Sequence, residues 1–165
     1  MKNLSKEELL SRLEAINRSN AIIYFDLSGI ILGVNDIFLV AMGYGIGNHE
    51  ELIGKHHSTF VCEEYATSLE YEKFWDILRS GKFYQGEFER RKKDGSLVNL
   101  QATYNPIFDE SGVITKVMKI ATDITETIVS KNKIEELSAK VKAELENSNK
   151  LRAAIEIEKD EAVND

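Results

Sequence analysis

The sequence is poor in the residues that cross-link or stiffen a chain. Its 165 residues include one cysteine, Cys62, and one proline, Pro106. A single cysteine excludes an internal disulfide bond, which is typical of a protein from a reducing compartment. The N-terminus lacks the apolar core of a secretory signal, and no uninterrupted apolar run approaches the roughly 20 residues of a membrane span. We therefore expect a cytoplasmic protein without a membrane span.

Positive charge is also scarce. The chain has 21 basic and 28 acidic residues and a formal net charge of -7, which argues against non-specific binding to nucleic acid. A basic run, residues 90–93, immediately precedes an Asp-Gly pair, so we predict that it lies in solvent at a hairpin tip. The length and the 42% hydrophobic content fit one packed domain with extensions.

The motifs of the common enzyme classes are absent. The sequence has no Gly-X-Ser-X-Gly motif, no histidine pair of a zinc protease and no Walker loop. Gly43, Gly45 and Gly47 alternate like a phosphate-binding loop, but they follow a predicted helix instead of a strand. They therefore indicate the end of that helix, and we predict that this chain is not an enzyme.

Residues 81–125 are predicted to form three consecutive antiparallel strands. Asp94-Gly95 is typical of the tight turn between the first two. Pro106 lacks an amide donor, so the pairing should change or end near it. Between these points apolar residues alternate with polar ones, as in a sheet with one buried face. The apolar set is Val98, Leu100, Ala102 and Tyr104, and the polar set is Asn99, Gln101, Thr103 and Asn105.

The first half of the chain is predicted to combine one hairpin with several short helices. Ser5 and Glu8 have the spacing of a capping box, so a helix should begin there. Asn35 can cap a second helix, and Gly81 should end a longer one. The expected elements are a hairpin of residues 21–26 and 30–34, helices at 37–42 and 67–80, a helical turn at 49–54, and an irregular or briefly helical segment at 55–66.

Residues 126–165 are predicted to form a long helix in a short, polar coiled coil. Because a lone amphipathic helix has little to bury against, we expect it to pair with a second copy. Glu144 and Glu158 weaken the heptad seam. The other seam positions are Ile134, Val141, Ser148, Ile155 and Ala162, with Leu137 and Leu151 as companions. The N-terminal helix is predicted either to pack on its own domain or to dimerise.

Several short motifs of this sequence occur in the order typical of a PAS sensory domain, and the chain resembles that family. The resemblance covers residues 20–125 and is closest to PAS domains of soluble bacterial chemoreceptors and aerotaxis-type sensors. It implies an α+β fold, in which a five-stranded antiparallel sheet carries short helices on one face. The expected parts are an N-terminal cap helix (1–19), the PAS domain (20–125) and a signalling helix (126–165). The motifs are Phe25-Asp26, Ser28-Gly29, Val34-Asn35, Gly43-Tyr44, Glu51-Leu52-Ile53-Gly54, the His56-His57 and Phe74-Trp75 pairs, Gly86-Glu87-Phe88, Lys93-Asp94-Gly95, Ala102 to Ile107, and Ala121 to Thr125.

The resemblance also implies a cofactor or ligand in the interior. Some chemoreceptor PAS domains bind haem through a histidine in this region, so His57 or its neighbour His56 is expected to ligate the iron of haem b. Adjacent histidines cannot easily point into one pocket, so at most one should bind metal. FAD is the alternative cofactor. Trp75 is expected to stack on a flavin or close a haem pocket, and Tyr104 and Asn105 to hydrogen-bond a ligand.

The sequence departs from the cofactor-binding relatives at several positions. Cys62 lies where light-sensing relatives keep a flavin-reactive cysteine, but its flanking residues differ, so we predict a buried, unreactive thiol. The helix at 67–80 has no histidine. Residues 116–121 lack the tryptophan with which haem sensors of this type often gate oxygen, and Asn99 replaces a frequent tryptophan. An empty interior or an unknown ligand therefore also fits.

We predict a sensor in bacterial chemotaxis or related signalling. A ligand or cofactor would favour one arrangement of the sheet, and a dimeric C-terminal helix would pass the difference to an output domain or protein. The alternatives are a ligand-free dimerisation or interaction module and a flavin redox sensor.

Overall fold

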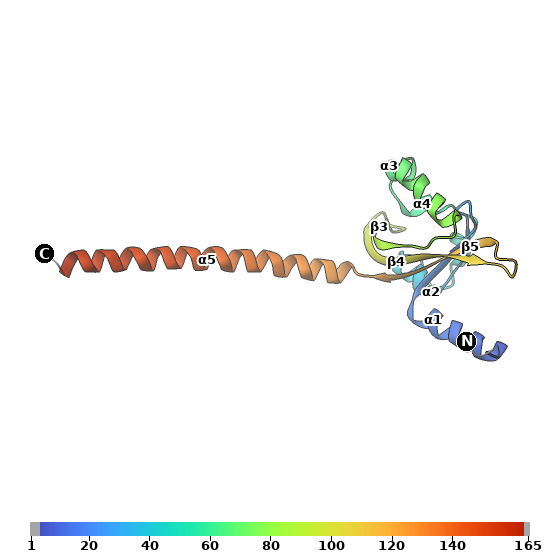
Figure 1. The fold of residues 1–165 in the computed structure, drawn as a ribbon, viewed down its shortest axis with the longest axis horizontal. Coiled ribbons are helices and arrows are strands. Elements are labelled where there is room, and N and C mark those ends of the chain that lie inside the picture. Colours follow the sequence, from blue (N-terminus) through green and yellow to red (C-terminus); the bar gives the residue numbers. More distant parts are fainter. Residues whose placement is uncertain (1–3, 164–165) are drawn as a thin grey trace. The chain divides into compact units, whose positions relative to one another are not determined.

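The computed structural model describes the backbone of residues 4–163 and the side chains of residues 4–157 and Lys159. The chain divides into two compact units, Met1–Thr125 and Glu126–Asp165. The first unit is built on a five-stranded antiparallel sheet with strand order β2-β1-β5-β4-β3 (Figure 1). The predicted α+β fold, with its five-stranded antiparallel sheet and long C-terminal helix, is confirmed.

The sheet joins a hairpin to a three-stranded meander. The hairpin consists of β1 (Ala21–Phe25) and β2 (Ile31–Val34), and the meander of β3 (Tyr84–Arg91), β4 (Leu97–Phe108) and β5 (Ile114–Asp123). β5 is the central strand, because it pairs with β1 on one side and β4 on the other. Inward side chains of β5 therefore reach the middle of the first unit.

The pairing around Pro106 differs in part from the prediction. β4 pairs with β3 only as far as Tyr104, so that ladder does end near the proline. The ladder with β5 continues, and Pro106 lies opposite Val117. The missing amide is tolerated because β4 has no β3 partner beyond Tyr104, which leaves one side of the proline without a ladder to interrupt.

The helices begin at the predicted polar residues. α1 (Lys6–Ser19) begins after Ser5, whose hydroxyl accepts a hydrogen bond from the backbone N–H of Glu8 at 3.1 Å. α2 (Asp36–Ala41) begins after Asn35, whose Oδ1 accepts from the N–H of Phe38 at 3.0 Å. The other helical segments of the first unit are η1 (His49–Glu51), η2 (His57–Phe60), α3 (Glu63–Ala66) and α4 (Leu69–Arg79).

The two faces of the sheet carry different elements. The four apolar residues of the alternation on β4 are all buried on the inner face, as predicted. α2 packs against β1, and α4 against β3 and β4. α1 lies over the outer face, so α1 and α4 are on opposite sides of the sheet (Figure 1).

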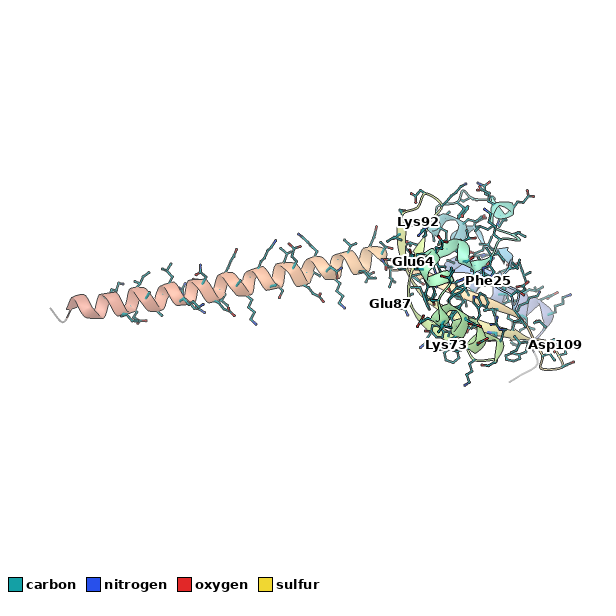
Figure 2. All side chains as sticks on the ribbon, turned by 90° about the horizontal axis from the view of Figure 1, so that it is seen from above. Phe25, Glu64, Lys73, Glu87, Lys92 and Asp109 are labelled. Carbon is teal, nitrogen blue, oxygen red and sulfur yellow. The ribbon has the colours of Figure 1, made fainter. Side chains whose placement is uncertain are left out.

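α5 (Thr125–Val163) is a single continuous helix. Figure 2 shows that its side chains project from all sides, and none of its described side chains is buried. The seam residues Ile134, Val141 and Ile155 are 67%, 63% and 45% exposed. The seam positions Glu158 and Ala162 lie outside the described side chains. The coiled coil therefore stays a prediction.

No helix within residues 4–163 combines the length and the apolar character that crossing a membrane requires.

Candidate functional site

His57 lies at the centre of a buried polar cluster. It is the first residue of η2, and its side chain has no solvent exposure. Its Nδ1 lies 2.9 Å from the hydroxyl of Tyr71, and its Nε2 lies 3.1 Å from that of Tyr104. Burial, reinforced by the charges on Arg90 and Lys119, lowers the pKa of His57 well below its usual value. The imidazole is therefore neutral, with one nitrogen donating and the other accepting.

Tyr104 connects His57 to two buried cations. Nη2 of Arg90 donates a hydrogen bond to the Tyr104 hydroxyl at 3.3 Å, and Nζ of Lys119 lies 4.9 Å from the centre of the Tyr104 ring. Arg90 is 5% exposed and Lys119 only 1%. Burial acts to raise the pKa of Tyr104, but the charges on Lys119 and Arg90 outweigh it, and the pKa is lowered. Burial lowers the pKa of Lys119 as well.

The cluster contains two cationic side chains and no carboxylate. Among the ion pairs of the described residues, none includes Arg90 or Lys119. Nη1 of Arg90 donates to the Glu89 carbonyl at 2.8 Å, and its guanidinium lies 4.8 Å from the centre of the Phe88 ring. Nε of Arg90 is buried without a hydrogen-bond partner in the described part of the chain. Because buried charge without a counter-ion is unfavourable, the cluster is electrostatically incomplete.

Trp75 belongs to the same cluster. This residue of α4 is 4% exposed, and its ring meets His57 and Phe25 edge-on, with centroids 5.6 and 5.9 Å apart. Its indole Nε1 is also buried without a hydrogen-bond partner among the described residues. Trp75 is thus a core aromatic whose indole N–H, like the Nε of Arg90, is a buried side-chain donor without a hydrogen-bond partner in that part of the chain.

His56 and Asn105 lie outside the cluster. His56 caps η2, because its Nδ1 accepts from the N–H of Ser58 at 3.2 Å. Its Nε2 lies 2.8 Å from the Ser28 carbonyl and must carry the proton, since a carbonyl only accepts. Asn105 follows Tyr104 along β4 and therefore points to the opposite face, where its Nδ2 donates to the Met118 carbonyl at 3.4 Å. Of the five residues expected at the site, the structure brings together His57, Trp75 and Tyr104.

Sequence reasoning missed the two cations. The prediction that the whole run 90–93 lies in solvent is wrong for Arg90, which shares the inner face with Phe88 two residues earlier. Lys119 likewise lies two residues after the buried Val117 on β5 and shares its inner face. The two-residue alternation of a strand, extended from β4 to β3 and β5, identifies both Arg90 and Lys119 as inward-facing.

The cluster as packed does not fit a haem on His57. An axial ligand needs a ring nitrogen whose lone pair is free for iron, and both nitrogens of His57 are in hydrogen bonds with tyrosines. The rings of Phe25, Tyr71 and Phe74 crowd the imidazole, with centroids 5.3, 5.7 and 5.8 Å away. No group of three or more metal-ligating side chains occurs among the described residues. Haem b on His57 stays a prediction that requires this packing to open.

Cys62 is exposed, so the prediction of a buried thiol is wrong. The residue lies at the N-cap of α3, and the following Glu63 and Glu64 are exposed as well. The exposed thiol lines the hollow beside β3 instead of the buried cluster around His57, and this arrangement gives no support to a flavin-reactive cysteine.

A hollow of about 310 Å³ opens beside Arg90 at the free edge of β3. Most of its walls are apolar, and the two carboxylates of Glu87 and Glu89 line it as well. Figure 2 shows Glu64 and Glu87 at this same edge of the first unit. The apolar lining comes from Phe60, Val61, Tyr65, Phe88 and Leu97.

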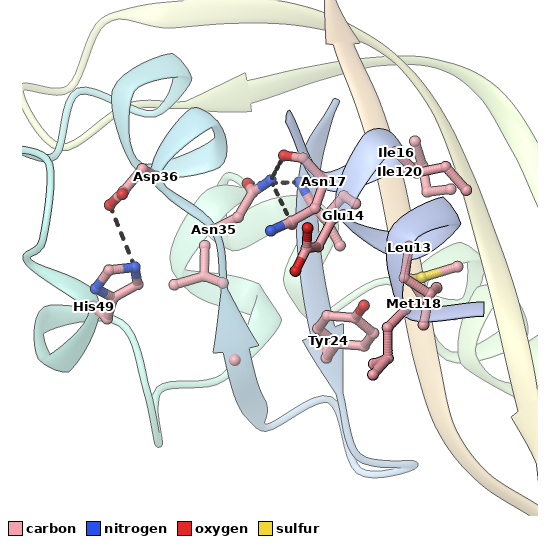
Figure 3. A pocket seen from close by; sticks show the side chains of 14 residues that line it. Leu13, Glu14, Ile16, Asn17, Tyr24, Asn35, Asp36, His49, Met118 and Ile120 are labelled. Atoms are coloured by element: carbon pink, nitrogen blue, oxygen red, sulfur yellow. Dashed lines mark hydrogen bonds and ion pairs between the residues drawn. The ribbon is translucent and has the colours of Figure 1, made fainter. Parts of the chain in front are cut away.

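A second hollow, of about 570 Å³, lies on the outer face between α1 and the sheet (Figure 3). Asn35 links α1 to the strands here, because its Nδ2 donates to the backbone carbonyls of Asn17 at 3.0 Å and Asn20 at 2.7 Å. Nε2 of His49 lies 3.3 Å from Oδ1 of Asp36 at its rim. The floor and wall are apolar and include Leu10, Leu13, Ile16, Ile22, Met118 and Ile120.

The chain matches a protein-family model described as PAS fold over residues 31–121. This span is more than half of the chain, and it contains His57, Arg90, Tyr104 and Lys119. The biofilm dispersion protein BdlA of Pseudomonas aeruginosa is 39% identical over 121 residues, which are 73% of this chain and 28% of that protein. The chain therefore spans under a third of the length of this relative.

Solved structures share the fold. The PAS domain of a protein from Colwellia psychrerythraea has a TM-score of 0.60 and 24% identity, covering 72% of this chain and 98% of that one. A light-oxygen-voltage domain studied with a flavin analogue has a TM-score of 0.59 and 18% identity, covering 79% and 95%. At these identities the likeness shows the fold alone.

Proposed function

This chain belongs to the PAS family, and from that premise we propose that it is a non-enzymatic sensory domain of the cytoplasm. In this proposal a small ligand or cofactor binds in the interior, and α5 passes the bound state to an output domain or protein in chemotaxis or related signalling. The relative BdlA, named for biofilm dispersion, supports a signalling role, since it shares 39% identity with this chain.

The incomplete cluster is the observation that carries this proposal. A domain that needed its interior only for stability would fill it with apolar side chains or with paired charges. This interior instead keeps Arg90 and Lys119 buried with no carboxylate, and it leaves the Trp75 N–H without a partner in the described part of the chain. Such a site gains its missing partners when a ligand binds.

A short route connects the cluster to α5. Arg90 on β3 lies opposite Val98 on β4, and Val98 directly precedes Asn99. The carbonyl of Asn99 accepts from the N–H of Ile124 at 2.8 Å, and its N–H donates to Oγ1 of Thr125 at 3.0 Å. Lys119 lies on β5, which leads into the same junction. A shift of β4 against β5 therefore acts directly on the first residue of α5.

The proposed state is a homodimer formed through the N-terminal and C-terminal helices. The apolar residues Leu9, Leu10 and Leu13 of α1 are 48%, 50% and 56% exposed. The seam residues of α5 are similarly exposed, and a second copy would cover both sets. This exposed apolar surface also favours the alternative function, a dimerisation or interaction module without a small ligand.

Haem b and FAD are the cofactors that the resemblance suggests. A haem could be held by His57 only if the hydrogen bonds to Tyr71 and Tyr104 opened, and it would then supply gas-binding iron. FAD is supported by the likeness in fold to a light-oxygen-voltage domain studied with a flavin analogue. A flavin would bring redox chemistry and would stack near Trp75. A colourless ligand is the third case, and it leaves the aromatic packing around His57 in place.

An absorption spectrum of the purified full chain, expressed with a supply of haem and flavin, separates these cases. A Soret band that shifts with oxygen and disappears in His57→Ala but not in His56→Ala establishes haem on His57. Flavin bands establish a bound flavin, and the mass of the nucleotide released on denaturation identifies it as FAD. A colourless protein excludes both as tightly bound cofactors and leaves the colourless ligand or the interaction module.

The sensory role itself is tested on α5. A spin label is attached at Ser138→Cys in a Cys62→Ser background, and the distance between labels of the two protomers is measured. Sensing predicts that this distance distribution changes when the interior site is filled. A distribution that stays the same with a bound ligand would contradict the sensory role and favour the interaction module.

A further inference from the structure

We propose that the cluster of Arg90, Lys119 and Tyr104 binds a small monocarboxylate with an apolar or aromatic body, which enters through the hollow at the β3 edge. This inference rests on the proposed sensory function and names the chemical class of its ligand.

The charge of the cluster selects an anion. Arg90 and Lys119 are 5% and 1% exposed, both lie against Tyr104, and neither is in any ion pair of the described residues. The Nζ of Lys119 lies 5.8 Å from the ring centre of Phe38 and 4.9 Å from that of Tyr104, so aromatic faces partly stabilise its charge. One anion would give both cations a counter-charge at once.

The free donor of Arg90 selects a planar anion. Two of the three guanidinium nitrogens are in hydrogen bonds, Nη1 with the Glu89 carbonyl and Nη2 with Tyr104, while Nε has no partner among the described residues. A carboxylate matches the fixed fork of a guanidinium, and a hydrogen bond to Nε would satisfy the donor that is otherwise unpaired.

The hollow selects a ligand with one charge and an apolar body. Its volume of about 310 Å³ lies at the lower end of the range for small-molecule sites. Phe60, Tyr65 and Leu97 offer apolar contacts. Arg91 also lines the hollow and offsets one of the two carboxylates of Glu87 and Glu89, so a second negative charge on the ligand would meet a net negative lining beyond Arg90. The half-buried ring of Phe88, which lies against the guanidinium, has to move aside as the carboxylate enters.

Calorimetric titration of the full chain with benzoate tests this inference. Benzamide serves as the neutral control, and acetate and succinate vary the body and the charge. We expect benzoate to bind, benzamide and succinate to bind at least about tenfold more weakly, and acetate to bind weakly because it has no aromatic body. Absence of binding by all three carboxylates at millimolar concentration, or equal affinity for benzoate and benzamide, would overturn the inference.

Variants locate the site. Arg90→Gln is expected to weaken benzoate binding about 10- to 100-fold, because a charge-assisted hydrogen bond is lost. Arg90→Lys keeps the charge but not the fork and should recover only part of the affinity. Arg79→Gln, an exposed arginine outside the cluster and the hollow, should bind like the wild type. If Arg90→Gln does not fold, Lys119→Met provides the same test from β5, with the exposed Lys116→Met as its control.

The outcomes for the two proposals are separable. Benzoate that binds through Arg90 but leaves the distance between labels at Ser138→Cys unchanged supports the carboxylate site and contradicts the sensory role. A haem-loaded or flavin-loaded protein whose label distance responds to its cofactor, but which binds no carboxylate, does the reverse.

Discussion

The two faces of the sheet are incomplete in different ways. The inner face is tightly packed, yet its buried cations Arg90 and Lys119 have no counter-ion among the described residues. The outer face is electrostatically ordinary, yet apolar residues such as Leu13, at 56% exposure, remain uncovered beside a hollow of about 570 Å³. In the proposals above, a small anion completes the first face and a second protomer covers the second face. The two faces of the sheet would then serve different purposes, ligand binding on one side and association on the other.

The largest contrast between the faces is expected from two tyrosine substitutions. Tyr104→Ala should lower the free energy of unfolding by about 3–5 kcal/mol, because it leaves a cavity and removes the hydrogen-bond partner of His57 and Arg90. Tyr24→Ala, on the outer face, should cost about 1 kcal/mol, since Tyr24 is only half-buried. Urea denaturation measures both. Equal losses would show that the inner cluster has no special role in stability.

Lys119→Met is expected to act in the opposite direction. Replacing a buried cation that has no counter-ion by an apolar side chain of similar length should raise the free energy of unfolding of the ligand-free protein by about 1–4 kcal/mol. Lys116→Met, on the same strand but exposed, should stay within about 0.5 kcal/mol of the wild type. Destabilisation by Lys119→Met would mean instead that Tyr104, whose pKa is lowered, already supplies the counter-charge as a phenolate.

The strand pattern shows how far the sequence could predict this inner face. Alternation placed Tyr104 correctly in the core, and the caps at Ser5 and Asn35 placed two helix starts. Burial of Arg90 and Lys119 was not predicted, because charge is normally excluded from cores, although both residues lie at inward positions of the strand alternation. Their position follows from tertiary pairing, in which inward positions of β3 and β5 face the same ring of Tyr104.

The cofactor prediction was limited for the same reason, because it lacked the tertiary contacts of the site. A histidine in a family resemblance suggests an iron ligand, but the hydrogen bonds of His57 to Tyr71 and Tyr104 arise from residues 14 and 47 positions away. Only the folded structure shows that both ring nitrogens already have partners, so His57 could be named from the sequence while its surroundings could not.

His57 should make stability depend on pH in a defined direction. Its pKa is lowered in the folded state, chiefly by burial and then by Arg90, Lys119 and His56, while the unfolded chain takes up the proton near a pH of about 6.5. Below that pH the unfolded state binds more protons, so the free energy of unfolding falls as the pH drops, by up to about 1.4 kcal/mol per pH unit. The fall continues until the pH reaches the folded pKa.

Urea denaturation at several pH values between about 7.5 and 5, the range in which an ordinary histidine changes its charge, tests this slope. The difference between wild type and His57→Gln isolates it from the carboxylates that titrate over the same range. A His57→Gln variant with an unchanged slope would show that the pKa of His57 is the same in the folded and the unfolded protein.

The smallest effect on folding, with a large one on assembly, is expected on the outer face. Leu13→Gln keeps a good helix former but removes apolar surface from α1, so the unfolding of the protomer should change by about 0.5 kcal/mol or less. Sedimentation equilibrium should nevertheless show a shift from dimer toward monomer, because Leu13 belongs to the exposed apolar residues of α1, together with Leu9 and Leu10. Leu69→Gln changes a leucine of α4 that is 67% exposed, more than Leu13 at 56%, and should leave the association unchanged. A monomeric wild-type protein, or a Leu13→Gln protein that stays dimeric, would contradict a dimer contact on the outer face. The buried cluster around Arg90 and Lys119 would then be the functional feature of the sheet that still has support.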